Sequence, residues 1–290
     1  MKLALLFFFY KDIDVCRNRL QLLKQYNPDS KIFGLYGGPK EEEDMFKEEL
    51  KAYFDDFYSL AGLDGFWIWI HNDLSMLKWY EARGKDLEWD SVVICQWDML
   101  AFESFEKVFA GIKKDEIYLP NFGRMKKAWE DSWYWTSKEH YEKALKEKPI
   151  NLPYMRGNLL AFKKLIAEKY QYTKKPFIGM IMFGVIPRLY FEKFKTVEQK
   201  EIGFLEYKVP TYAKIFKIPV FNKYLGEYRL IPHKGFLNRI RNRFFNRTNR
   251  CSMNALKRPI RPHYIRQELK KKNGWRVFHP YFEVFDLKKK

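Results

Sequence analysis

The sequence predicts an α/β fold with a mostly parallel sheet flanked by helices. Strand-like and helix-like runs alternate through the first hundred residues, and the strand-like runs are continuously apolar. Strands of a parallel sheet read this way because helices cover both faces of the sheet. Hydrophobic residues make up 47% of the chain, so it has the material for a sizeable core and is not globally disordered.

The first element is a continuous apolar run over residues 3–10, which predicts a buried strand. The run is too short to span a bilayer, and the acids Asp12 and Asp14 follow it in place of a small-residue cleavage site. Periodicity and the Gly, Asn and Pro residues between runs define the elements that follow. We expect strands at residues 31–36, 54–60, 66–70 and 91–95, and helices at residues 16–26, 41–53 and 74–83.

The alternation weakens after residue 100. We expect helices at 102–109 and 157–169, and the apolar stretch 177–190 is interrupted by Gly and Pro in the manner of an element that lines a cleft. The stretch 234–276 contains Pro259, Pro262 and Gly274, which favours loop and short helix over sheet.

No internal repeat or low-complexity linker divides the chain. We therefore expect a single domain over residues 1–290. Its expected parts are a ligand-binding half at 1–105, a second half at 106–232 and a basic C-terminal segment at 233–290.

Charge is concentrated near the C-terminus. The formal net charge is +18, and residues 234–276 hold fourteen Lys or Arg against the single acid Glu268. A local excess of this kind suits a phosphorylated small substrate, an anionic membrane surface or nucleic acid. Five arginines are interleaved with phenylalanines there, which suits lipid headgroups or single-stranded nucleic acid. These residues are Arg239, Arg241, Arg243, Arg247 and Arg250, with Phe236, Phe244 and Phe245.

The three cysteines are far apart and include no Cys-x-x-Cys pair. That pattern indicates free thiols in a reducing compartment, and it supports neither a disulfide scaffold nor a zinc site.

The most informative carboxylate is Asp98, which follows the β-branched run 91–95 almost directly. A buried strand that ends in an acid places it at the sheet edge where open α/β folds bind ligands. A hard divalent cation that bridges a diphosphate prefers such an oxygen ligand. The alternative is that Asp98 only caps the helix expected next in the chain.

The order of these pieces resembles the GT-A glycosyltransferases. In that family an Asn, a helix and a Gly precede a strand that ends in Asp-x-Asp or a reduced version of it. Here Asn72-Asp73-Leu74 is followed by Gly84 and then by a strand that ends in Gln96-Trp97-Asp98. Gln96 stands where the first Asp would be, and this departure puts the metal requirement in question. The resemblance covers residues 1–105 well and continues more loosely through Arg156–Phe162.

The resemblance implies a Rossmann-like GT-A fold, a nucleotide-diphosphate sugar donor and Mn²⁺ or Mg²⁺ as cofactor. It also implies donor contacts from the turns after the first two strands and from the residues around Asp98. For Tyr36 and Gly37 the alternative is a simple turn, and for Asp73 it is a helix cap. Lys271 and Arg276 would neutralise charge on the leaving group, unless they only form a solvated face. The expected donor-side residues are Tyr10, Tyr36, Gly37, Asn72, Asp73, Gln96, Trp97, Lys271 and Arg276.

A second metal ligand in such folds often comes from a histidine near the C-terminus. His279 is the best candidate because a neutral imidazole binds divalent metals and an apolar run precedes it. The alternative is a partly buried histidine bonded to a backbone carbonyl, and His263 is the next choice.

The acceptor side is the least specified. An inverting transferase needs a carboxylate near the acceptor hydroxyl, and Glu130 and Asp131 form a pair among Trp129, Trp133 and Trp135. The pair lies upstream of the position expected from the family. Without a base, a retaining mechanism is the alternative.

The function expected from the sequence is metal-assisted sugar transfer to a saccharide, lipid-linked or protein-linked acceptor. The alternatives are a nucleotidyltransferase on a similar fold and a non-catalytic nucleic-acid-binding protein. The first usually has a Gly-rich loop after the first strand, which is absent here, and the second leaves Asp98 unexplained. We expect a cytoplasmic protein that docks peripherally on an anionic membrane face, and we do not expect a nucleic-acid partner.

Overall fold

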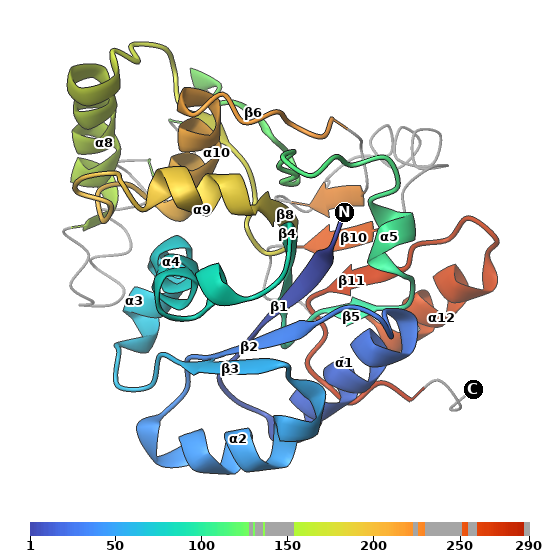
Figure 1. Cartoon of the computed structure of the whole chain (residues 1–290). Coiled ribbons are helices and arrows are strands. Elements are labelled where there is room, and N and C mark those ends of the chain that lie inside the picture. Colours follow the sequence, from blue (N-terminus) through green and yellow to red (C-terminus); the bar gives the residue numbers. More distant parts are fainter. Residues whose placement is uncertain are drawn as a thin grey trace, which may run out of the picture.

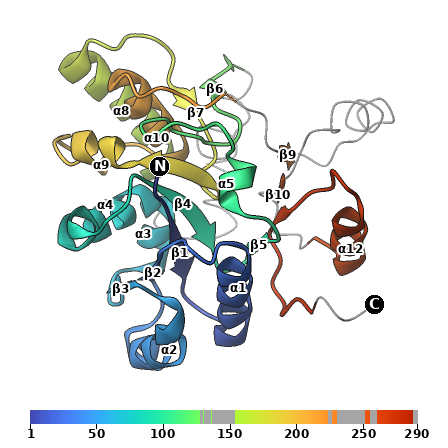
Figure 2. The ribbon, with the colours of Figure 1, turned by 45° about the vertical axis from the view of Figure 1, so that its right-hand side comes forward.

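The computed structural model describes residues 1–127, 130, 136, 154–222, 226–229, 251–254 and 260–286. Most of its helices and strands are labelled in Figure 1, and β7 and β9 are labelled in Figure 2. The elements of the first hundred residues are β1 (Leu3–Phe9), α1 (Ile13–Tyr26), β2 (Ile32–Tyr36), α2 (Glu43–Leu50), β3 (Asp56–Ser59), α3 (Gly65–Ile70), α4 (Asn72–Ala82) and β4 (Ser91–Gln96). Short 3-10 turns lie at Lys40–Glu42, Lys51–Tyr53 and Gly84–Asp86.

The rest of the chain is less regular. Its elements are β5 (Leu100–Ala101), α5 (Phe105–Val108), β6 (Gly123–Arg124), α8 (Tyr154–Tyr170), β7 (Phe177–Ile178), β8 (Gly184–Pro187), α9 (Arg188–Phe194), α10 (Leu205–Ile215), β9 (Gly226–Arg229), β10 (Cys251–Asn254), α12 (Pro262–Lys270) and β11 (Val277–His279). Among the described residues, no helix is both long enough and apolar enough to cross a bilayer.

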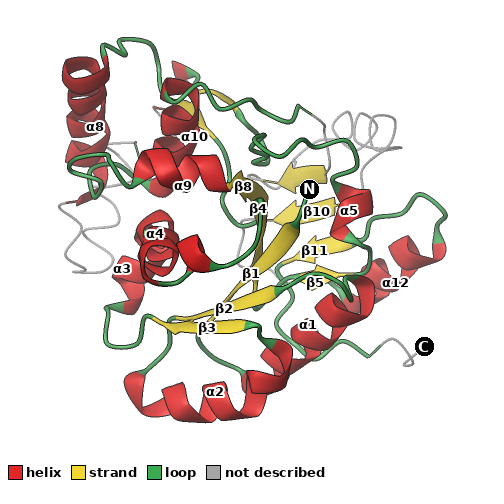
Figure 3. Cartoon of the chain, in the orientation of Figure 1, coloured by secondary structure: helices red, strands yellow, loops and turns green. Residues whose placement is uncertain are grey.

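The central sheet has the strand order β3-β2-β1-β4-β8 (Figure 3). The pairs β3–β2, β2–β1 and β1–β4 are parallel, and the edge strand β8 runs antiparallel to β4. The prediction of an α/β fold with a mostly parallel sheet is therefore confirmed. The strands expected at 3–10, 31–36, 54–60 and 91–95 are the first four strands of this sheet.

Helices cover both faces of the sheet, which explains why β1 is apolar at every position. Leu5, Phe7 and Phe9 belong to one core cluster, together with residues of α1 and α2. Leu6 and Phe8 belong to the other cluster, together with residues of α4, α9 and α10. In Figures 1 and 2, α1 lies on one side of β1, and α3 and α4 lie on the other.

A second sheet joins the middle of the chain to its C-terminal part, with the strand order β5-β11-β10-β9. β11 pairs antiparallel with β5, so that Phe278 lies opposite Leu100 and Val277 opposite Ala101. β10 runs parallel to β11 and β9. The expectation of loop and short helix over 234–276 is thus correct for α12 and wrong for β10.

One further element departs from the prediction. Residues 66–70 are not a strand but part of α3, whose first turn is capped by Asp64: its Oδ1 accepts a hydrogen bond of 2.7 Å from the Trp67 amide. A short apolar run has no clear period, so the side-chain pattern alone does not separate strand from helix. The cap decides the conformation locally.

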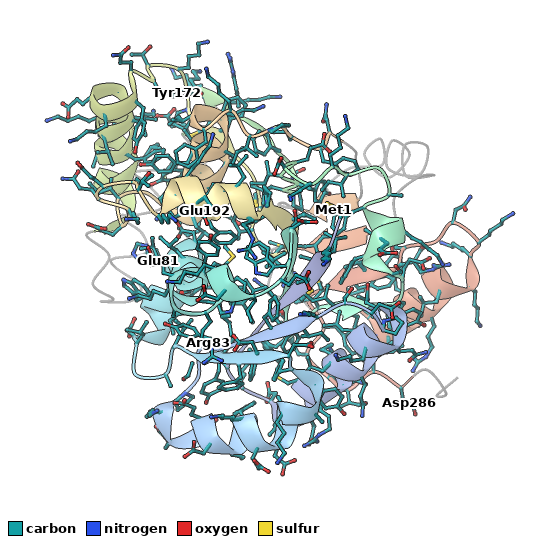
Figure 4. All side chains as sticks on the ribbon, in the orientation of Figure 1. Met1, Glu81, Arg83, Tyr172, Glu192 and Asp286 are labelled. Carbon is teal, nitrogen blue, oxygen red and sulfur yellow. The ribbon has the colours of Figure 1, made fainter. Side chains whose placement is uncertain are left out.

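The stretch expected as one cleft-lining element at 177–190 is divided between β7, β8 and the start of α9. α9 is fastened to α4 by the Tyr80 hydroxyl, which donates a hydrogen bond to Glu192, labelled in Figure 4. This contact ties the helices on one face of the sheet to each other.

Candidate functional site

The carboxyl ends of the central strands gather the residues that the sequence singled out. β1 and β4 are parallel and in register, with Phe8 opposite Gln96. Tyr10 leaves the sheet after β1, and Trp97 and Asp98 leave it at the same edge after β4. Asp98 does not cap the following helix, because α5 begins at Phe105 after Ser104. The capping alternative is therefore wrong.

His279 reaches this edge from the far end of the sequence. Its Nε2 lies 3.1 Å from Gln96 Oε1 and 3.3 Å from Asp98 Oδ1. The Tyr281 amide donates a 2.8 Å hydrogen bond to the Asp98 carbonyl and holds the two segments together. Asp98 and His279 are buried, with 9% and 7% of their surface exposed.

These three donors fit a divalent cation. Two ligands about 2.1 Å from an octahedral cation and at right angles to each other lie about 3 Å apart, close to the separations seen here. Asp98 Oδ1 is buried and accepts no hydrogen bond from the residues that the structure describes, so it has a lone pair to offer. No group of three or more His, Cys, Asp or Glu residues is arranged for metal binding within the described part of the chain. A cation at Asp98 and His279 would therefore depend on the Gln96 amide oxygen and on oxygens of the substrate.

An aromatic wall stands beside the three donors. Trp97 stacks on Phe282 with ring centroids 5.8 Å apart, and Tyr10 meets Trp97 edge-on at 5.5 Å. The Lys11 ammonium lies 4.7 Å from the centre of the Trp97 ring. Tyr10 is 46% exposed. Its partial burial and the charge of Asp98 raise the pKa of its hydroxyl. The wall offers exposed ring edges and a cation next to the acid.

Tyr36 does not offer its ring to a ligand. The side chain is completely buried, its ring packs on Phe9 and Phe46, and its hydroxyl donates a 2.8 Å hydrogen bond to the Pro39 carbonyl. Burial raises the pKa of Tyr36 to about 12. A contact from this turn would thus come from the Gly37 backbone, as in the alternative interpretation of a turn.

Asp73 faces the interior as well. Its carboxylate lies 2.8 Å from Lys208 Nζ, and both side chains are fully buried between α4 and α10. Neighbouring His71 is buried too, and burial, followed by the charge of Lys208, lowers its pKa to about 4. Asn72 Oδ1 is buried and accepts no hydrogen bond within the described part of the chain. The start of α4 therefore forms a polar interior, and Asp73 acts there as a buried ion-pair partner.

Lys271 and Arg276 are engaged within their own segment. The Arg276 guanidinium donates hydrogen bonds to the carbonyls of Glu268, Trp275 and Lys271, and so closes the turn after α12. Lys271 pairs with the Glu268 carboxylate. Both cations stabilise this turn, so a role toward phosphate would require them to leave these partners.

Of the predicted acceptor pair, only Glu130 belongs to the described residues. Glu130 forms an ion pair with Lys163. Asp131, the surrounding tryptophans and the Arg- and Phe-rich stretch at 234–250 lie outside the described residues. A role for them stays a prediction.

The sequence did not single out Glu206, in the first turn of α10. Its carbonyl accepts a 2.9 Å hydrogen bond from the Gly179 amide, in the segment that leads into β8. Burial raises the pKa of its carboxyl to about 8. An acid in an apolar stretch, here Gly203-Phe-Leu-Glu206, is the signal that could have identified it.

Arg19 of α1 was missed as well. It is 1% exposed, and its Nη2 donates to the carbonyls of Tyr281 and Glu283 at 2.8 and 2.7 Å. Burial lowers the pKa of Arg19 to about 10, while the nearby Asp98 charge acts in the opposite direction. Its position in a helix did not predict its burial, because an arginine next to leucines in an amphipathic helix is usually solvated.

No family model and no curated protein matches this sequence. Among solved structures, the chain is similar to the galactosyltransferase LgtC in complex with donor and acceptor sugar analogues, at 9% identity over 82% of each chain and a TM-score of 0.38. It is also similar to mouse xyloside xylosyltransferase 1, at 8% identity, 96% of this chain, 97% of that chain and a TM-score of 0.39. A 4-diphosphocytidyl-2C-methyl-D-erythritol synthase from Anaerococcus prevotii gives 12% identity, 85% and 96% coverage and a TM-score of 0.41. These similarities concern the path of the chain alone.

Proposed function

We propose that this protein is a glycosyltransferase that moves a sugar from a nucleotide-diphosphate donor to a saccharide, lipid-linked or protein-linked acceptor. The observation that carries the proposal is the meeting of Gln96, Asp98 and His279 at the carboxyl edge of a parallel sheet. This edge is where open α/β folds bind nucleotides. One buried carboxylate oxygen that accepts no hydrogen bond from the described residues, beside an imidazole and an amide, suits a cation that also binds phosphate.

Mn²⁺ or Mg²⁺, when bound, would supply positive charge to the diphosphate leaving group. The residues that would hold it are Asp98 and His279, with Gln96 as a third oxygen donor. Tyr10 and Phe282 would limit the access of water to this point, because both rings pack on Trp97 next to Asp98. The exposed Lys11 ammonium lies on the same wall and would attract the donor phosphates.

Glu206 is our candidate for the group that takes the acceptor proton. Gly184 of β8 lies opposite Ile94 of β4, so the chain enters β8 at the edge where β4 ends. The Gly179–Glu206 hydrogen bond joins the start of α10 to the segment that leads into β8. A carboxyl with a pKa of about 8 is mostly protonated at neutral pH, and its ionised form is a stronger base than an ordinary glutamate.

The test is a panel of nucleoside diphosphates and nucleotide sugars, assayed for a rise in melting temperature with and without Mn²⁺. One nucleoside diphosphate should stabilise the protein in the presence of Mn²⁺, and Asp98→Ala should abolish the effect. Asp29→Ala, an exposed loop position, is the matched control and should respond like the wild type. Indifference to every nucleotide, together with tight binding of oligonucleotides, would exclude the proposal.

The nucleotidyltransferase alternative predicts a different product. Such an enzyme would release pyrophosphate from a nucleoside triphosphate, whereas a glycosyltransferase would release a nucleoside diphosphate from a nucleotide sugar. Chromatography of the nucleotide products separates these two outcomes.

A further inference from the structure

The C-terminal segment, residues 280–286, forms one wall of the site although it has no regular secondary structure. It follows His279 directly, its Tyr281 amide bonds the Asp98 carbonyl, and its Phe282 stacks on Trp97. An irregular segment lacks the hydrogen bonds of a sheet, so other groups must fix its position. Asp286, labelled in Figure 4, lies at its end.

Two adjacent residues of α1 provide most of this fixation. The Asn18 side chain exchanges two hydrogen bonds with the Phe285 backbone, of 3.1 and 3.0 Å. Arg19 bonds the carbonyls of Tyr281 and Glu283 and lies over the Tyr281 ring at 5.4 Å. The segment is thereby tied to α1 at three alternate residues, Tyr281, Glu283 and Phe285.

The contact requires the burial of a charged side chain, which lowers the stability of the fold. Its guanidinium is buried, and no carboxylate of the described residues forms an ion pair with it. Burial of a charge carries a large desolvation penalty, and apolar replacements of buried ionic groups are often neutral or stabilising. Stability alone would thus favour a leucine or methionine, whereas a guanidinium can bind two carbonyls at once.

We propose that Arg19 is a positioning residue that holds the C-terminal segment against α1 and so keeps His279 and Phe282 beside Asp98. As far as it concerns metal binding, this inference rests on the proposed function. Arg19 touches neither His279 nor Asp98 through a hydrogen bond and acts through the backbone of Tyr281 and Glu283.

The test is Arg19→Met, with Mn²⁺ alone as the probe and electron paramagnetic resonance of free Mn²⁺ as the readout. Loss of a supporting contact should weaken Mn²⁺ binding about tenfold. Removal of a positive charge near Asp98 would by itself have the opposite effect and tighten binding. The direction of the change therefore separates positioning from simple electrostatics.

Arg17→Met is the matched control, because Arg17 lies on the same helix and pairs with Asp14 and Glu49 at the surface. It should leave Mn²⁺ affinity unchanged. In a His279→Ala background, Arg19→Met should cause little further loss, because the ligand that it positions is already absent. A loss of equal size in both backgrounds would contradict the inference.

Hydrogen exchange of residues 281–286 is the second readout and requires no metal. These amides should exchange faster in Arg19→Met than in the wild type or in Arg17→Met. If Arg19→Met does not fold, Asn18→Ala loosens the same segment without removing a buried charge and should give the same pattern. Unchanged exchange in the variant that folds would overturn the positioning role. If the wild type binds no Mn²⁺, the proposed metal site fails, and exchange alone decides the role of Arg19.

Discussion

His279 Nε2 lies 3.3 Å from Asp98 Oδ1, although the two residues come from opposite parts of the sequence. The register of the second sheet accounts for this. Phe278 of β11 lies opposite Leu100 of β5, so the residues just before β5 and just after Phe278 are brought side by side. A shift of register in this short pairing would separate the two side chains.

The first prediction concerns His279. His279→Ala should weaken Mn²⁺ binding about tenfold or more, because it removes the nitrogen donor and leaves a single carboxylate and an amide. His263→Ala is the control, since His263 is exposed on α12 and was the second choice from the sequence. Calorimetric titration with Mn²⁺ measures both. A larger loss in the His263 variant would reassign the nitrogen ligand.

The second prediction concerns Gln96, which stands where the first Asp of the expected Asp-x-Asp motif would be. Gln96→Asp should bind Mn²⁺ about tenfold more tightly, about 1.4 kcal/mol, because it places a second negative charge beside His279. Gln25→Asp adds the same charge at an exposed position of α1 and controls for net charge. Weaker binding by Gln96→Asp would show that the amide is not directed at a cation.

The sequence predicted the first half of the fold because its strands and helices carry strong, separate periodic patterns. It also predicted Asp98 at a strand end and named His279. The structure brings these two residues together because β11 pairs with β5. No local sequence pattern predicts that strand pairing. The prediction of a strand at residues 66–70 is wrong, because the apolar run of the short helix α3 is compatible with both helix and strand.

The buried polar residues were the least predictable part. Arg19 and Lys208 have the sequence context of solvated side chains, yet both are buried by elements distant in the chain. Their partners are backbone carbonyls in one case and Asp73 in the other. Long-range burial of this kind leaves no periodic signal, whereas Asp98 was detectable because its position depends on one local strand.

The third prediction concerns pH and Glu206. Its pKa is about 8 in the folded protein, against an ordinary value of 4.5, so the folded state binds a proton that the unfolded state releases between these values. This contribution to stability is fully present below about pH 4.5 and is lost as the pH rises toward 8. Glu206→Gln should remove this part of the pH dependence and stabilise the protein above pH 8 relative to the wild type.

Urea denaturation at several pH values between 5 and 9 measures the effect. Glu201→Gln, an exposed position a few residues earlier, should keep the wild-type profile. A Glu206→Gln variant with the same pH dependence as the wild type would mean that the carboxyl is not protonated in the folded state.

The fourth prediction concerns the buried pair Asp73 and Lys208. Lys208→Met leaves the Asp73 carboxylate buried without its cation and should cost about 3–5 kcal/mol of unfolding free energy. Adding Asp73→Asn should recover much of this loss, because the double variant buries no unpaired charge. Lys164→Met breaks the exposed pair with Glu168 and should change stability by only about 0.5 kcal/mol. Denaturant unfolding monitored by circular dichroism gives all three values. If Lys208→Met were no more destabilising than Lys164→Met, the pair would not anchor α10 to α4.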